Sequence, residues 1–195
     1  SVMARGDAII ANSEYTREHI LTNYEVMPER ITAIPRGVDL DVFDRDKISA
    51  DDIAALRATW GLAPDDKRNV VFVPARLTRW KGQLVLIEAV KMLEARHPGA
   101  VKVIIAGDDQ GRRAYSVEML SAIKAAGLQD AVAMVGHLRQ MPLAFAASDM
   151  AVFPVIEPEA FGRGAVEAQA MGVPVIASNL GGYTEHQVPL LVRDQ

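Results

Sequence analysis

The stretch "VKVIIAG", residues 101–107, decides the fold class. It is an almost unbroken apolar run that ends in glycine, and "NVVFV" (69–73) has the same character. Such runs are typical of strands that helices cover on both faces of a parallel sheet. Further strands are expected at 132–135, 150–153 and 174–177, with helical patterns between the strands near 82–96, 112–126, 139–147 and 161–171. This alternation predicts a doubly wound, parallel, Rossmann-like α/β sheet with right-handed crossovers.

The first sixty residues follow a looser pattern. A strand is expected within 7–13, a helix over 14–23 and a second strand at 30–35. Ser49 followed by Asp52 resembles a capping box and predicts the start of a further helix. Because the chain starts in the middle of a structural pattern, we expect it to be a piece of a longer protein.

The composition limits the classes of protein to which the chain can belong. Half of its 195 residues are hydrophobic, which is enough for a sizeable core in one domain with an attached segment. A net charge of -4 argues against a nucleic-acid partner, since such proteins usually carry a basic stripe. The chain has no cysteine, which excludes disulfides and thiolate metal sites and is compatible with the cytosol.

Ligands of a parallel α/β sheet bind beyond the carboxyl ends of its strands. The segments that follow the predicted strands are 74–82, 107–113, 136–140, 154–164 and 178–185. The first of them holds Arg76, Arg79 and Lys81, just before a predicted helix. Arginine acts as a planar fork and lysine as a point charge, and together they can neutralise a diphosphate. A solvated basic loop is the alternative interpretation, but the position at a strand end favours a functional role.

A second candidate site is "EPEAFGRGAVEAQAMG", residues 157–172. If a helix starts near Phe161 or Gly162, its free backbone N–H groups form an anion site. Glu159 precedes this helix and Glu167 lies in its second turn. Carboxylates do not bind phosphate, so beside a phosphate site they are expected to accept hydrogen bonds from sugar hydroxyls. The alternative is that Glu159 only favours the helix start and that Glu167 lies on a solvated face.

Other motifs in the chain are weak. "GRGAVE" matches half of a dinucleotide fingerprint, but Glu167 replaces the third glycine and the motif does not follow the first strand of the sheet. A nicotinamide-dependent oxidoreductase is therefore disfavoured. The four histidines have no metal-ligand spacing. We interpret the aspartate pairs within 39–41 and 44–46 as solvated turn residues, and we expect no metal.

Taken together, "EPEAFGRGAVEAQAMGVPVIAS", "PARLTRWKGQ", "AIPRGVDLDVF" and "ANSEYTR" resemble the retaining, nucleotide-sugar-dependent glycosyltransferases of family 4, which have the GT-B fold. The resemblance covers roughly residues 7–185, and its most specific element is the spacing between Glu159 and Glu167. It implies that residues 31–195 are the C-terminal, donor-binding Rossmann-like domain. It also implies that residues 1–30 are a remnant of the N-terminal acceptor domain or a linker.

The resemblance also implies roles for individual residues. Arg76 and Lys81 would hold the donor diphosphate. Glu159 would contact hydroxyls of the donor sugar near the reacting carbon, and Glu167 would bind the ribose hydroxyls. Backbone amides of Phe161 and Gly162 would hold phosphate oxygens or sugar hydroxyls, while the nucleotide base would lie against Gly136, His137 and Leu138.

We therefore expect the donor half of a glycosyltransferase that moves a hexose from a nucleotide diphosphate with retention of configuration. No cofactor or metal is expected beside the nucleotide sugar. The family implies a lipid-linked or lipopolysaccharide-type acceptor, bound by the missing N-terminal domain, and a cytoplasmic protein peripheral to the inner membrane. The chain on its own is expected to be inactive, and the alternative is a nucleotide- or sugar-binding module without catalysis.

Overall fold

The core of the protein is one parallel sheet. The computed structural model describes residues 4–111, 113–186 and 190–192, so residue 112 of the expected fourth helix and residues 187–189 and 193–195 at the chain end lie outside it. The sheet is built from β3 (Asn69–Pro74), β4 (Val101–Ala106), β5 (Val132–Gly136), β6 (Met150–Phe153), β7 (Val175–Ser178) and β8 (Leu190–Val192). Its strand order is β5-β4-β3-β6-β7-β8, and every pairing is parallel. The predicted fold class is confirmed, and β8 is a strand that the sequence pattern did not reveal.

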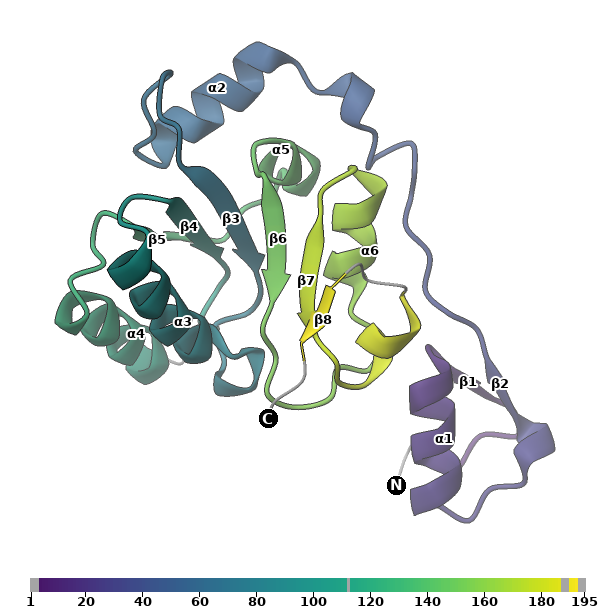
Figure 1. Cartoon of the computed structure of the whole chain (residues 1–195). Coiled ribbons are helices and arrows are strands. Elements are labelled where there is room, and N and C mark those ends of the chain that lie inside the picture. Colours follow the sequence, from purple (N-terminus) through teal and green to yellow (C-terminus); the bar gives the residue numbers. More distant parts are fainter. Residues whose placement is uncertain (1–3, 112, 187–189, 193–195) are drawn as a thin grey trace.

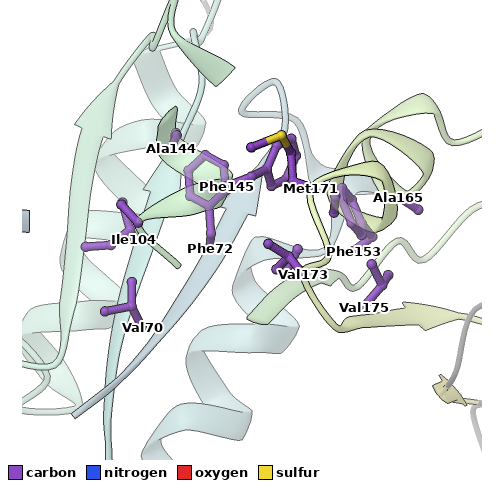
Figure 2. Packing of buried hydrophobic residues seen from close by; sticks show 14 of the residues in the cluster. Val70, Phe72, Ile104, Ala144, Phe145, Phe153, Ala165, Met171, Val173 and Val175 are labelled. Carbon is purple, nitrogen blue, oxygen red and sulfur yellow. The ribbon is translucent and has the colours of Figure 1, made fainter. Parts of the chain in front are cut away.

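Helices cover both faces of this sheet (Figure 1). The helices are α2 (Ala50–Thr59), α3 (Gln83–Arg96), α4 (Arg113–Ala125), α5 (Met141–Ala146) and α6 (Arg163–Ala170). Successive side chains of a strand point to opposite faces, so β3 sends Phe72 to one core and Val71 to the other. Phe72 meets Phe145 of α5 edge-on, with ring centroids 5.4 Å apart (Figure 2). On the other face Val71 packs with buried residues of α3 and α4, among them Ile87 and Met119.

The N-terminal segment forms a small unit of its own. Strand β1 (Ile9–Ala11) pairs in parallel with β2 (Ile31–Ala33), and α1 (Glu14–Asn23) connects the two strands. Ile9, Ala11, Ile20 and Ile31 make its small apolar core. Because β2 pairs with β1 and not with the large sheet, we propose to place the domain boundary after β2, where the sequence had suggested residue 30.

The order of the large sheet reverses between β3 and β6, so the connections from these two strands diverge there. Such a reversal is where ligands of doubly wound sheets bind. Gly82, just before α3, has a φ of +72°, and a Cβ added to it would lie 1.7 Å from the carbonyl oxygen of Pro154, just after β6. Two residues away in each segment, the N–H of Ile156 donates to the carbonyl of Trp80 at 2.9 Å. The segments that follow β3 and β6 therefore lie directly against each other.

This close approach predicts an unusually costly glycine substitution. Gly82→Ala should lower the free energy of unfolding by about 2–5 kcal/mol, since it combines backbone strain with a clash against main-chain atoms. Gly99→Ala is the matched control, because Gly99 has a similar φ of +69° but no atom within 4 Å of an added Cβ. It should cost only about 1–2 kcal/mol. Urea denaturation followed by circular dichroism measures both, and equal losses would contradict the argument.

Candidate functional site

An ion pair lies where the strand order reverses. Lys81, in the turn between β3 and α3, contacts the Oε2 of Glu159, in the segment between β6 and α6. The two side chains are only 14% and 17% exposed, so the pair is largely withdrawn from water. The structure thus brings together two of the three residues that were predicted as catalytic. Neither side chain would find its partner without the contact between the segments at Gly82.

The ring of Trp80 lies beside two cations of this site. Lys81 Nζ lies 4.0 Å from the centroid of the Trp80 ring, and Arg76 Cζ lies 5.9 Å from it. Cations over an indole face are attracted by roughly 0.5–2 kcal/mol. Arg76 is exposed and has no ion-pair partner within the described part of the chain. Sequence reasoning missed Trp80, although an aromatic residue between two cations in a loop after a strand was the available signal.

The other cation of this loop points elsewhere. Arg79 donates to Glu118 of α4, with an Nη1–Oε1 distance of 3.1 Å, and its guanidinium lies over the Tyr115 ring. Arg79 therefore links α4 to the turn and does not join Lys81. The backbone of Arg76 is held instead by Gln83, whose side-chain amide donates to the Arg76 carbonyl at 2.9 Å. Gln83 is fully buried, and its oxygen accepts from the Tyr115 hydroxyl.

The segment that follows β7 fixes the backbone of Glu159. Gly181 forms an isolated β-bridge with Glu159, and the N–H of Gly182 donates to the Glu159 carbonyl at 2.7 Å. An added Cβ at Gly181 would lie 2.3 Å from that carbonyl oxygen. Both positions therefore require glycine. The predicted ligand-binding segment 178–185 thus acts here as the support of the Glu159 loop.

Helix α6 starts two residues later than the sequence suggested, at Arg163. Its N-cap is Gly162, with a φ of +85°, and no described side chain caps the helix. A Cβ on Gly162 would lie 2.4 Å from the ring of Tyr183. Burial, together with the negative charge of Glu159, raises the pKa of the Tyr183 hydroxyl far above its ordinary value. The uncharged ring of Tyr183 therefore packs against Gly162 at the uncapped start of α6.

Phe161 serves the site through packing. Its side chain is buried, and its ring meets the His186 ring edge-on at a centroid distance of 4.4 Å. The Nε2 of His186 also contacts the Phe161 carbonyl. These contacts fix the position of the turn that leads into α6. His186 is a second residue whose role the sequence did not indicate, since its partner lies 25 residues away.

Glu167 lies on α6 and is paired within its own helix. Arg163 Nε donates to Glu167 Oε1 at 2.9 Å, and the Glu167 side chain is 12% exposed. Burial raises the pKa of Glu167 above its ordinary value, and the neighbouring Arg163 opposes that shift only in part. No contact within the described part of the chain joins Glu167 to Lys81. Glu167 is therefore paired separately from the Lys81–Glu159 ion pair.

Gly136 is the last residue of β5, an outermost strand of the sheet, and His137 and Leu138 follow it. Strand β4 separates β5 from β3, so the three residues lie roughly 10 Å from the end of β3, at about 4.8 Å per strand. His137 is exposed, and Leu138 packs against the core beneath α5. The carbonyl of Gly136 accepts from the N–H of Gly107, with an N–O distance of 2.8 Å. This position places the three residues along the same sheet edge as the cations but not in contact with them.

The described part of the chain also has a separate apolar groove. It has a volume of about 900 Å³ and runs between α3 and the strands β6 and β7. Its walls include Val85, Leu86, Val152 and Ile176, whereas Lys81 and Glu159 do not line it. The charged site therefore lies outside this groove.

The described residues contain neither a cluster of potential metal ligands nor a helix suited to cross a membrane. No group of three or more histidine or acidic side chains there is arranged to hold a metal ion. None of the described helices combines the length and apolar character that crossing a membrane requires.

Comparison with known families accounts for nearly all of the chain. The family model described as "Glycosyl transferases group 1" matches residues 57–188, and the model described as "Glycosyltransferase Family 4" matches residues 1–42. The two matches leave residues 43–56 uncovered, a range that includes the first part of α2.

Curated relatives and solved structures show the same relationship. D-inositol 3-phosphate glycosyltransferases of Segniliparus rotundus and Stackebrandtia nassauensis are 31% and 33% identical over 100% and 94% of this chain. The chain spans only 40% and 41% of their lengths.

Among solved structures, a glycosyltransferase from Rickettsia africae is 31% identical with a TM-score of 0.86 and matches 95% of this chain and 48% of its own. Anabaena HepE, solved with UDP-glucose, is 32% identical with a TM-score of 0.82, over 92% of this chain and 47% of its own. The chain therefore belongs to the group 1 glycosyl transferases and has the fold of the C-terminal domain of a GT-B glycosyltransferase.

Proposed function

We propose that this chain carries the donor half of a glycosyltransferase site, which binds a nucleotide-diphosphate hexose and transfers the sugar with retention of configuration. The observation that carries the proposal is the Lys81–Glu159 pair beside Trp80 and Arg76, at the point where the strand order reverses. The UDP-glucose bound to the similar HepE supports a uridine donor. The glycosyltransferase names of the curated relatives support the reaction type.

The cations act on the leaving group. When the bond between the anomeric carbon and the phosphate oxygen breaks, its electron pair passes to the diphosphate, whose negative charge increases. Arg76, Lys81 and the uncapped N–H groups of α6 offer fixed positive charge to this diphosphate. Groups that meet charge as it develops lower the barrier, and losing one typically costs about 10²–10³-fold in rate.

The two acids act on hydroxyl groups. Glu159, which is paired with Lys81, can accept hydrogen bonds from the donor sugar near the reacting carbon. Glu167 on α6 would accept from the ribose hydroxyls, and the base would extend along the sheet edge towards Gly136–Leu138.

For the acceptor and the cellular location of the protein, the proposal names only a class. The acceptor is a hydroxyl compound bound outside this domain, and the protein works in the cytoplasm. The relatives' names point to D-inositol 3-phosphate, whereas the sequence had suggested a lipid-linked or lipopolysaccharide-type acceptor. Assays of the whole protein with these acceptor classes would separate them. Donor binding without transfer to any acceptor would favour the alternative of a non-catalytic binding module.

The cations give the sharpest test of the donor site. Arg76→Ala and Lys81→Ala should each weaken UDP-glucose binding by about 10- to 100-fold, because each removes a charge-assisted contact worth roughly 1.5–3 kcal/mol. Isothermal titration calorimetry measures the dissociation constants.

Arg79→Ala is the matched control for this experiment. It removes a cation from the same turn, but that cation is paired with Glu118, so binding should be unchanged. Lys81→Ala also strips a buried partner from Glu159, so its folding is checked by circular dichroism. Arg76 is exposed and does not share this problem. Wild-type affinity in the Arg76 variant would remove this residue from the proposed site.

Glu167 predicts an acid-sensitive affinity. Its pKa lies above the ordinary glutamate value of about 4.3, so on acidification it gains a proton while ordinary glutamates are still charged. The protonated group is a poorer acceptor, and UDP-glucose affinity should fall between neutral and mildly acidic pH. Protonation at this raised pKa favours the folded state, so the loss is not unfolding caused by Glu167.

Glu167→Gln separates this effect from other titrating groups, including the histidines. The variant should bind more weakly at neutral pH and should lack the part of the acid dependence that Glu167 causes. The measurement is the UDP-glucose dissociation constant of both proteins across the same pH series. Identical pH profiles would contradict the role of Glu167.

The proposal also includes transfer without a metal ion. Arg76, Lys81 and the α6 start supply the positive charge that a divalent cation provides in other sites. Donor binding and turnover of the whole protein should therefore survive dialysis against EDTA. Activity that returns only on addition of magnesium would count against this part of the proposal.

A further inference from the structure

The start of α1 is held by a carboxylate from the far end of the chain. Glu185 accepts the N–H of Glu14 at 3.0 Å through one oxygen and the N–H of Tyr15 at 2.6 Å through the other. The first N–H groups of a helix have no partner within the helix and carry partial positive charge. A carboxylate that takes two of them is a strong cap, and here it comes from a residue about 170 positions away.

The same helix end also touches the Glu159 loop. Ser13, the N-cap of α1, is completely buried and donates its hydroxyl to the carbonyl of Ala160, with an Oγ–O distance of 2.5 Å. The Thr16 hydroxyl lies 3.2 Å from the same carbonyl. Ala160 directly follows Glu159, so the N-terminal unit bonds to the backbone next to a proposed sugar-binding residue.

These contacts form a closed loop of hydrogen bonds and chain segments between α1, the Glu159 loop and Glu185. From Ala160 this closed loop passes to Glu159, whose backbone is bonded to Gly182. The short 3-10 helix Gly182–Glu185 then leads to the Glu185 carboxylate and back to α1. By contrast, residues 35–44 contain no helix or strand, and at about 3.3 Å per residue they could reach some 30 Å. The covalent connection alone therefore does not determine where the N-terminal unit lies.

We propose that Glu185 is a positioning residue that clasps the N-terminal unit to the donor loop. The clasp consists of the α1 start (residues 13–16), Ala160 and Glu185. It holds β1, α1 and β2 in one orientation against the large domain and restrains the backbone of Glu159 from outside the site. Glu185 itself need not touch the donor. This inference goes beyond the proposed function, because it concerns how two parts of the chain are joined.

The absence of cysteine from the sequence makes a distance measurement direct. Spin labels at Thr22→Cys on α1 and Ser121→Cys on α4, both exposed positions, report the separation of the two parts by double electron–electron resonance. The clasp predicts one narrow distance distribution for the unmodified interface and a broad one for Glu185→Ala. Glu185→Gln, which keeps one acceptor but loses the charge, should lie between them. Glu88→Ala, which removes an exposed glutamate of α3, is the control and should leave the distribution narrow.

A second variant, Glu14→Pro, distinguishes loss of the clasp from misfolding of the Glu185→Ala protein. Glu14→Pro removes one of the two donor N–H groups, yet proline is well tolerated at the first position of a helix, and Ser13 before it is already extended. It should broaden the distribution while the helix content in circular dichroism is unchanged. A narrow distribution in both folded Glu185→Ala and Glu14→Pro would overturn the clasp. So would a broad distribution before any change at the interface.

Donor affinity provides the second readout. Because the clasp restrains the Glu159 loop, Glu185→Ala should raise the UDP-glucose dissociation constant several-fold, and Glu88→Ala should not change it. An unchanged constant would overturn the link from clasp to donor loop. If the chain does not bind UDP-glucose at all, the proposed function fails, while the distance measurement still decides whether the clasp exists.

Discussion

The site depends on how closely two main-chain segments approach each other at Gly82. Wherever a doubly wound sheet reverses its strand order, the chains leaving two neighbouring strands turn to opposite faces and open a crevice. Here the backbone at Gly82 lies so close to Pro154 that no side chain fits between them. The turn with Lys81 and the segment that leads to Glu159 are therefore held side by side, and their ion pair follows from the backbone.

The ion pair and Trp80 together prepare a site for an anion. Lys81 is held between a carboxylate and an indole face, which leaves its charge fixed in place before any ligand arrives. Arg76 shares the indole, but it keeps its charge free among the described residues. Charge that is oriented in advance needs no rearrangement when a diphosphate binds or departs, and such preorganisation is the main source of electrostatic catalysis.

Much of this arrangement could be predicted from the sequence, because strands and the turns after them are local features. The runs at β3 and β4 are apolar enough to indicate their place in the sheet, and segments after neighbouring strands must meet at one edge. That logic placed Lys81 near Glu159. It failed where side chains have partners distant in sequence: Arg79 pairs with Glu118 on α4, and Glu185 bonds to α1 at the opposite end of the chain. Strand β8 is only three residues long, too short for its pattern to stand out.

The acids beside the start of α6 look misplaced for an anion site until their partners are considered. Glu159 is paired with Lys81, and Glu167 is paired with Arg163. Each acid is therefore paired with a cation of its own, so neither acid cancels the positive electrostatic potential at the uncapped helix start or at Arg76. The carboxylate oxygens remain acceptors for hydroxyl groups even while paired. The proposed ligand, with a diphosphate between two polyhydroxyl rings, is the chemical complement of such an edge, because its charge would meet amides, Lys81 and Arg76 while its hydroxyls would meet the paired acids.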